Sequence, residues 1–296
     1  GRRLWGGGGG GGSLSLLATA AIPRNECCRG ETNPRCQRPL IVWKLGRTGS
    51  SYLAEQLESS NDVCYFVPEL TNHLNHSNCA EIAEAADAVL SCNFPGDVSG
   101  FSLNPFKFSS LSSCADEIMN VTERRQPAVV VLTRNNVVAQ RVSSEISKLS
   151  SLRAQESGLD FKDYGVGCGP YHRYRCDDLP VEYAQPILNV RPEEFVESVK
   201  DQIEQNDRLL KFVESWFGEE KVFQLAFEDL IRVTSLNMTI ASWLNRNVLC
   251  NCECDRLPPV EQFESSTPLQ AKLENYDEVH AYVAENAPEF LEFFGR

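Results

Sequence analysis

The segment from residue 40 to residue 57 constrains the fold of this chain most, because three patterns follow one another there. Leu40-Ile41-Val42-Trp43 is a continuous apolar run of the kind that a parallel sheet buries on both faces. Gly46-Arg47-Thr48-Gly49-Ser50-Ser51 comes next, and apolar residues then recur at helical spacing. The segment therefore predicts a buried strand, a glycine-containing loop and a helix that starts at the loop.

Further apolar runs indicate that this alternation continues along the chain. Three of them predict strands, at Val63–Val67, Ala128–Leu132 and Val222–Phe227. One helix is predicted after the run at Ala128–Leu132 and as far as Ser150, and another from Pro192 to Phe217. Pro192 suits a first helical turn, and Gly218 suits a helix end. Strands that alternate with helices predict a mostly parallel, doubly wound sheet.

The N-terminal residues differ in composition from the rest. Gly6–Gly12 is an unbroken glycine run that cannot pack, so residues 1–26 are expected to be a glycine-rich stem or linker. Residues 27–296 are expected to form a single α/β domain. No stretch of apolar residues is long enough to predict a membrane-spanning helix, so membrane contact is expected only through an additional N-terminal anchor, if there is one.

The charge balance excludes one broad class of partner. The chain has 28 Lys and Arg against 41 Asp and Glu, which gives a formal net charge of −13. A general nucleic-acid binder holds the phosphate backbone with net positive surface, so we expect no nucleic-acid partner. A local cluster of Arg side chains and backbone N–H groups can still bind a small anion on an acidic protein.

The cysteines indicate an oxidising compartment. There are 12 of them, an even number spread over the whole chain, which fits disulfides better than one metal cluster. Cys250, Cys252 and Cys254 form a local group, but their spacing is narrower than zinc sites favour and no His is near. We therefore expect no metal and a disulfide-stabilised protein of the secretory pathway, where its Asn-x-Ser/Thr sequons could carry glycans.

The loop after the first strand contains the groups that an anion needs. A helix N-terminus carries partial positive charge and unpaired N–H groups. Arg47 adds a full charge and a planar fork suited to phosphate or sulfate oxygens. The plainer interpretation is a helix capped by Ser50 or Ser51, with Gly49 in a tight turn, and the loop alone does not decide between the two. The loop lacks the Lys of a Walker A motif, which disfavours an ATPase or a kinase.

A second polar element follows the strand at Ala128–Leu132. Arg134 stands just after that strand, where parallel sheets bind ligands. Asn136, Gln140 and Ser143 share one face of the helix that comes next. Each residue alone is typical of a protein surface, but together with the first loop they predict a second phosphate pocket.

These segments resemble the sulfotransferases that use 3′-phosphoadenosine-5′-phosphosulfate (PAPS), in particular the Golgi carbohydrate sulfotransferases and the bacterial trehalose-sulfotransferase-like proteins. Arg47-Thr48-Gly49-Ser50-Ser51 is similar to the family's 5′-phosphosulfate loop, and Arg134 with Ser143 is similar to its 3′-phosphate element. Three further segments match in the expected order, namely Gly100-Phe101, Phe227-Glu228-Asp229-Leu230 and Glu274-Asn275-Tyr276-Asp277-Glu278-Val279.

The resemblance implies a fold and an activity. The fold would be α/β and P-loop-like, with three layers and a mostly parallel sheet flanked by helices, stabilised here by disulfides. The activity would be transfer of a sulfuryl group from PAPS to a hydroxyl or amine of a carbohydrate or another small acceptor, without a metal. The product would be 3′-phosphoadenosine-5′-phosphate (PAP), and the location would be the Golgi lumen or the exterior of the cell.

The resemblance also implies which residues contact the donor. Arg47, Thr48, Gly49, Ser50 and Ser51 would hold the 5′-phosphosulfate, and Arg47 would stabilise the leaving phosphate during catalysis. Arg134 and Ser143 would hold the 3′-phosphate.

A general base should take the proton of the acceptor hydroxyl. Glu69 follows the predicted strand Val63–Val67 and matches the place of the proposed base in carbohydrate-type and trehalose-type relatives. The plainer interpretation is that Glu69 lies in the first turn of a helix that begins near Leu70. His73 and His76 are the other candidates for the base.

An inactive relative is the alternative to an enzyme. Asn135 and Ser102 stand where relatives often have Arg and Lys, which favours a secreted domain that binds a nucleotide or a glycan without turnover. The acceptor pocket is expected in loops at residues 70–125 and 151–190.

Overall fold

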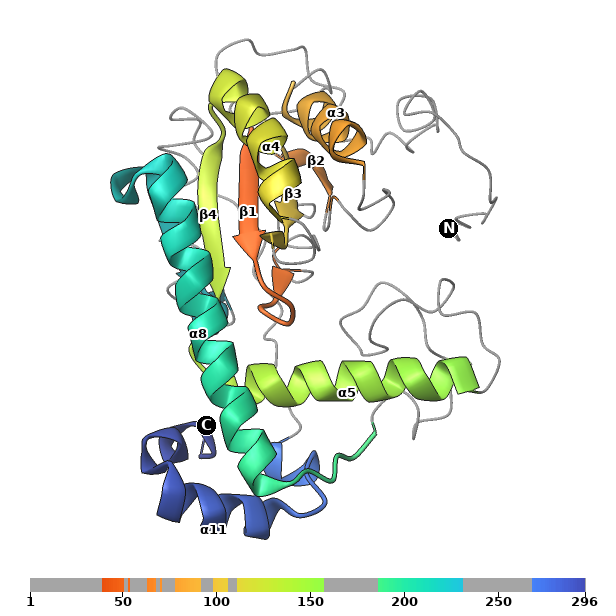
Figure 1. Cartoon of the computed structure of the whole chain (residues 1–296), viewed down its shortest axis with the longest axis vertical. Helices are drawn as coiled ribbons and strands as arrows, with labels where there is room; N and C mark the ends of the chain where they lie inside the picture. The colour runs from red at the N-terminus through yellow and green to blue at the C-terminus, as the bar shows by residue number, and fades with distance from the viewer. Residues whose placement is uncertain are drawn as a thin grey trace.

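The computed structural model of the chain describes residues 39–50, 53, 63–67, 70, 78–91, 98–105, 111–156, 186–230 and 268–295. Figure 1 shows a parallel sheet with helices against it in the upper part of the view, and a group of helices in the lower part. Helix α8 (Pro192–Phe217) runs through both parts. The expected stem at residues 1–26 lies outside the described residues, as does the boundary drawn at residue 27.

Five strands form the sheet in the order β2-β3-β1-β4-β5, and every neighbouring pair is parallel. The strands are β1 (Leu40–Lys44), β2 (Val63–Val67), β3 (Val98–Leu103), β4 (Ala128–Thr133) and β5 (Val222–Ala226). After β1 the chain runs to the β2 edge and returns through β3, and it then crosses to the other side of β1 to form β4. Sheets with such a reversal bind ligands at the carboxyl ends of the strands beside it, which are here β1 and β4.

The core of the upper part lies on the face of the sheet that carries Trp43. This face is covered by α3 (Cys79–Leu90), α4 (Leu111–Arg125) and the C-terminal half of α8. The ring of Trp43 is only 2% exposed and packs against Phe212 and Phe217 of α8, with centroids 5.8 and 6.2 Å away. The opposite faces of β1 and β4 are buried as well, which explains why both strands are continuous apolar runs.

A second apolar cluster forms the lower part. It joins the N-terminal half of α8 to α5 (Val137–Glu156), α11 (Tyr276–Asn286) and the 3-10 helix η6 (Pro288–Phe293), with Val138, Val199 and Val279 fully buried. The remaining short helices are η4 (Glu219–Lys221), α9 (Phe227–Leu230) and η5 (Leu269–Ala271). None of the described helices is long and apolar enough to cross a membrane.

Backbone pairing attaches the segment after η5 to the start of α8. Leu188 and Leu273 form an isolated parallel bridge. The side chain of Asn275 then bonds both backbone groups of Val190, because its Nδ2 donates to the carbonyl at 2.7 Å and its Oδ1 accepts from the N–H at 3.2 Å. These contacts fix the position of residues 268–275.

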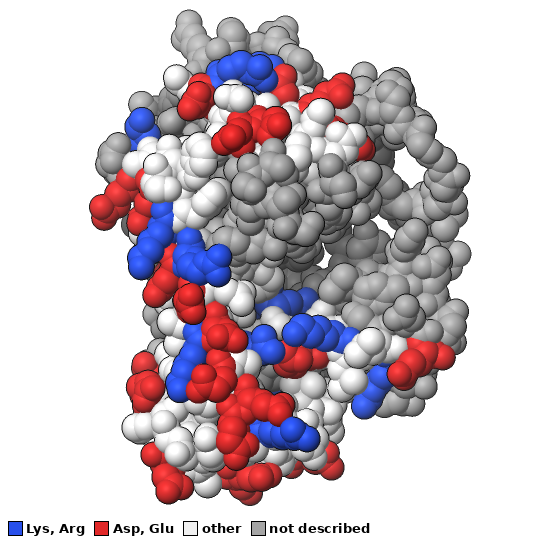
Figure 2. Space-filling model, viewed as in Figure 1, with Lys and Arg blue, Asp and Glu red and all other residues white. Residues whose placement is uncertain are grey.

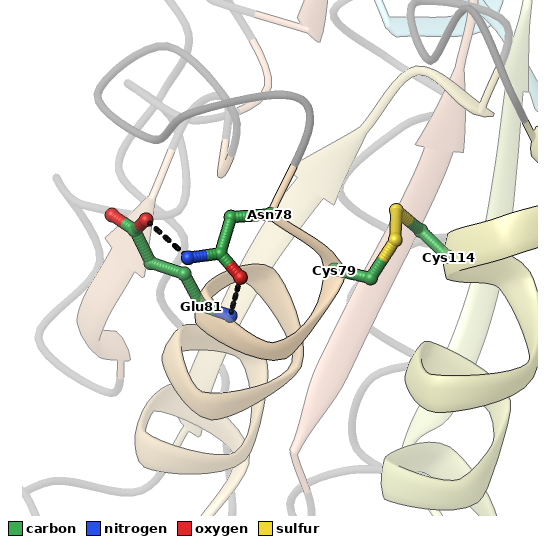
Figure 3. Close-up of a disulfide and its surroundings, with 4 residues drawn as sticks. All are labelled: Asn78, Cys79, Glu81 and Cys114. Carbon is green, nitrogen blue, oxygen red and sulfur yellow. Dashed lines mark hydrogen bonds between the residues drawn. A yellow bond between two sulfur atoms is a disulfide. The ribbon is translucent and has the colours of Figure 1, made fainter.

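A disulfide between Cys79 and Cys114 links α3 to α4. Figure 3 shows it at the N-terminal end of α3, where the Asn78 side chain caps the helix by accepting the N–H of Glu81 at 3.2 Å. The expected disulfide stabilisation is confirmed for this pair. The side chains of the other cysteines lie outside the part of the chain that the structure describes.

The sequence patterns predicted β2 and α8 at their observed bounds and the ends of β1, β4 and β5 to within one residue. The α/β class, the parallel sheet and its flanking helices are confirmed. Helix α5 continues to Glu156, beyond the predicted Ser150. The expectation that residues 70–125 are loops is wrong, because this range contains α3, β3 and α4.

Candidate functional site

The loop after β1 has an unusual backbone. Arg47 and Gly49 both have positive φ, at 64° and 83°. The hydroxyl of Thr48, which is fully buried, donates to the carbonyl of Leu45 at 3.1 Å and so holds the turn closed. The N–H of Leu53 donates to the carbonyl of Gly49 at 3.0 Å, which marks a helical turn that begins at Ser50. The predicted strand, loop and helix start are therefore present.

Gly49 has no room for a side chain. A Cβ at this position would overlap the ring of Phe227, the first residue of α9 after β5. The glycine is therefore required both by its φ of 83° and by the close approach of that ring.

Arg134, at the end of β4, lies beside this loop. Its side chain is 15% exposed, and its Nη1 donates to the carbonyl of Arg47 at 3.4 Å. The guanidinium carbon is 4.8 Å from the centroid of the Phe227 ring, and Nε is 3.9 Å from a carboxylate oxygen of Glu228. Within the described part of the chain, Nε is buried and has no hydrogen-bond acceptor. An oxygen atom of a ligand would be able to accept a hydrogen bond from this Nε–H group.

Burial explains the electrostatics of Arg134. It is the main reason that the pKa of the guanidinium falls to about 10, and the nearby positive charge of Arg47 lowers this pKa further while Glu228 raises it. Burial also lowers the pKa of Arg47. Both side chains would be stabilised by an anion that entered the site.

The carboxylate of Glu228 binds the backbone of the turn between β4 and α5 more closely than it binds Arg134. Its carboxylate accepts the backbone N–H groups of Asn135 and Asn136 at 2.9 and 3.0 Å. Asn136 in turn caps α5, because its Oδ1 accepts the N–H of Ala139 at 2.8 Å. The backbone N–H groups of Asn135, Asn136 and Ala139 therefore already have partners, so an anion here would be bound mainly by side chains.

Two side chains of α5 reach back to the loop, as their shared helical face predicts. Gln140 is fully buried and donates to the carbonyl of Gly46 at 3.0 Å, while its own oxygen accepts from Asn206 of α8 at 3.3 Å. The hydroxyl oxygen of Ser143 accepts from Nε of Arg47 at 2.8 Å. The loop is therefore attached to both α5 and, through Gln140, α8.

A third cation, from the C-terminal part of the chain, interacts electrostatically with Arg134. Lys272 follows η5 in the segment that pairs with Leu188. Burial lowers the pKa of its ammonium group, and the positive charge of Arg134 lowers it further.

The charges at the site do not balance. Arg47 and Arg134 meet at the loop, and the charge of Arg134 acts on Lys272. Glu228 is the single carboxylate paired with any of the three among the described residues. In that part of the chain, Arg47 and Lys272 have no carboxylate partner. Like charges held together in a half-buried site favour the binding of an anion. Figure 2 shows many acidic side chains, interspersed with Lys and Arg, over α8 and toward the α11 end of the molecule, and further acidic side chains in the upper part of the view.

The structure brings together most of the predicted site residues. Six of them lie in or against one cluster at the ends of β1 and β4: Arg47, Thr48, Gly49, Ser50, Arg134 and Ser143. The two groups of residues expected to bind phosphates are adjacent, because Arg47 of the first group donates to Ser143 of the second. Ser51 and the proposed base Glu69 lie outside the described residues, as do His73 and His76.

The sequence analysis did not single out Lys272, whose charge interacts with that of Arg134. It lies two residues before the Glu274–Val279 segment, so its proximity to that motif was the one signal available. Phe227 and Glu228 were matched as a motif without a role, and the structure places both against Arg134. Comparison of the chain with family models, with curated proteins and with solved structures found no match.

Proposed function

We propose that the chain is a PAPS-dependent sulfotransferase that moves a sulfuryl group to a hydroxyl or amine of a carbohydrate or another small acceptor. The observation that supports this most is the pair of arginines at the loop after β1: Arg134 donates to the carbonyl of Arg47, and Glu228 is the one carboxylate paired with either side chain among the described residues. PAPS and PAP carry phosphate groups at both the 3′ and 5′ positions, so a site with an excess of positive charge fits them.

The P-loop-like identity of the fold is part of this proposal. The loop follows β1, which lies between β3 and β4, and it turns directly into a helix at Ser50. Loops in this position bind phosphates in nucleotide-binding α/β proteins, which supports a nucleotide donor.

Sulfuryl transfer needs position and electrostatic stabilisation more than covalent help from the protein. The acceptor oxygen attacks sulfur, the bond from sulfur to the bridging phosphate oxygen breaks, and PAP leaves with the electron pair. Arg47 would stabilise the negative charge that develops on this oxygen, and Arg134, Ser143 and Lys272 would hold the 3′-phosphate. Glu69 would take the proton of the acceptor hydroxyl.

Binding of PAP is the first test. Wild-type protein should be stabilised against urea by about 2.7 kcal/mol at a PAP concentration about 100 times its dissociation constant. Adenosine 5′-phosphate should stabilise less, and adenosine should have no effect, because they lack one or both phosphates. Absence of any stabilisation by PAP would overturn the proposal.

Transfer is the second test. Radiolabelled PAPS should label at least one acceptor among monosaccharides, glycan fragments, phenols and amines. The variant Lys272→Ala should lose binding and transfer, whereas Lys211→Ala, which removes an exposed charge from α8, should keep both. Binding of PAP without transfer to any acceptor would contradict the enzyme and leave the inactive binding domain.

A further inference from the structure

Phe227 contacts both arms of the anion site. It is the first residue of α9, directly after β5, and is 7% exposed. One side of its ring lies where a Cβ of Gly49 would be, and the guanidinium carbon of Arg134 is 4.8 Å from its centroid. A single ring therefore touches the loop after β1 and the cation after β4.

The two contacts do different things. The contact with Gly49 sets how closely the loop can approach β5, because the loop has no side chain there to act as a spacer. The contact with Arg134 is a cation–π interaction, which stabilises a positive charge that burial otherwise disfavours. The ring of Phe227 thus packs against the guanidinium of Arg134. The N–H groups of the guanidinium remain for hydrogen bonds, of which Nη1–H already donates to the carbonyl of Arg47 and Nε–H has no acceptor among the described residues.

We propose that Phe227 is a positioning residue of the anion site. Its ring holds the guanidinium of Arg134 and the backbone of Gly49 at a fixed spacing, so that both present their polar groups to the same anion. The identity of that anion as PAP rests on the proposed function, but the positioning role does not depend on it.

An ordinary core residue would behave differently in one respect. Truncating it would lower stability, and it would weaken ligand binding equally whether or not Arg134 is present. A positioning residue that acts through Arg134 loses its effect on binding once Arg134 is gone. A double-mutant cycle measures this difference.

The experiment uses Phe227→Leu, Phe227→Tyr, Arg134→Ala and the double variant Phe227→Leu/Arg134→Ala. Leu keeps apolar volume beside Gly49 but has no π face, whereas Tyr keeps the ring. Affinities for PAP and for inorganic pyrophosphate are measured by calorimetry at pH 7, and urea denaturation reports whether each variant is folded. Phe227→Leu should weaken binding about tenfold, Phe227→Tyr about twofold or less, and Phe227→Leu in the Arg134→Ala background about twofold or less.

Each outcome has one meaning. Equal losses from Phe227→Leu in both backgrounds, or unchanged affinity in folded Phe227→Leu, would overturn the positioning role. If wild type binds pyrophosphate but not PAP, the proposed function fails while the pyrophosphate cycle still decides the role of Phe227. If wild type binds neither, there is no anion site, and both proposals are overturned. Should Phe227→Tyr fail to fold, the Leu cycle remains decisive.

Discussion

Replacing Arg134 by methionine should stabilise the protein when no ligand is bound. The guanidinium is 15% exposed and its Nε lacks an acceptor among the described residues. Burial is the main reason that its pKa falls to about 10, so the folded state holds this charge at a cost. Methionine has a similar length, can fill the same space over Phe227 and has no charge to desolvate.

The magnitude follows from the pKa of Arg134. Each unit of pKa corresponds to about 1.4 kcal/mol, so a depression to about 10 corresponds to roughly 3 kcal/mol that the folded state loses at neutral pH. Methionine also removes the contacts with Phe227 and with the carbonyl of Arg47, which together stabilise by about 1–2 kcal/mol. The expected net gain is therefore about 1–2 kcal/mol in the free energy of unfolding.

Urea denaturation at pH 7, in a buffer free of phosphate and sulfate, measures this gain. Arg191→Met is the matched control, because the Arg191 side chain is 80% exposed and paired with Glu194. It should change the free energy of unfolding by less than about 0.5 kcal/mol. A loss of more than about 1 kcal/mol in Arg134→Met would refute the reasoning, since Arg134 would then be holding the fold together.

The guanidinium of Arg134 also makes the free energy of unfolding and the anion affinity depend on pH in opposite directions. Between pH values of about 10 and the higher pKa that Arg134 has in the unfolded chain, the guanidinium is protonated in the unfolded state and mostly neutral in the folded state. The unfolded state therefore binds more protons, and the contribution of Arg134 to the free energy of unfolding rises with pH. Anion affinity needs the charged form and should fall as the pH passes about 10. Calorimetry with PAP from pH 8 to about 10.5 should show a steeper fall in wild type than in Arg134→Met, where Arg134 no longer contributes and Lys272, whose pKa burial lowers, still loses its charge.

Three further substitutions test other parts of the structure. Arg47→Ala should cost about 2–4 kcal/mol of transition-state stabilisation in kinetics with PAPS. Lys148→Ala, which removes a charge paired with a carboxylate on α5, should keep wild-type rates. Equal rates in the two variants would exclude Arg47 from catalysis. Glu69→Gln should lower the rate about 10²–10⁴-fold and retain PAP binding, and an active variant would leave the base to a histidine. Changing Cys79 and Cys114 together to Ser should lower the free energy of unfolding by about 3–4 kcal/mol in urea, since the disulfide links residues 35 positions apart; unchanged stability would show that the bond constrains nothing.

The elements that the sequence predicted well are those whose local pattern and buried environment agree. β4 is apolar from Ala128 to Leu132 because both of its faces are covered there, and α8 begins with Pro192 and is capped by Gly218. β3 was not predicted, because Ser99, Gly100 and Ser102 interrupt its apolar residues. Its place beside β1 follows from packing that no local window contains, since a Cβ on Gly100 would overlap the backbone of Leu40.

The residues of the candidate site also fall into those that a local sequence pattern reveals and those that depend on tertiary packing. Arg47, Arg134 and Ser143 could be found because each lies within a few residues of a recognisable strand end or on a predictable helix face. The proximity of Phe227 and of the charge of Lys272 to Arg134 could not be derived, because they depend on how β5 pairs with β4 and how the segment after η5 pairs with Leu188. Tertiary contacts between segments distant in sequence leave no periodic signal.

The attachment of residues 268–275 to the start of α8 has a consequence for biosynthesis. A chain that stops before residue 268 still contains the sequences of all five strands and the loop after β1. It lacks Lys272, and it also lacks the α11 and η6 side chains that cover Val199. Lys272 can contribute its charge only after residues 268–275 have been made and Asn275 has paired with Val190. Anion affinity would therefore distinguish chains that contain this segment from chains that stop before it during synthesis.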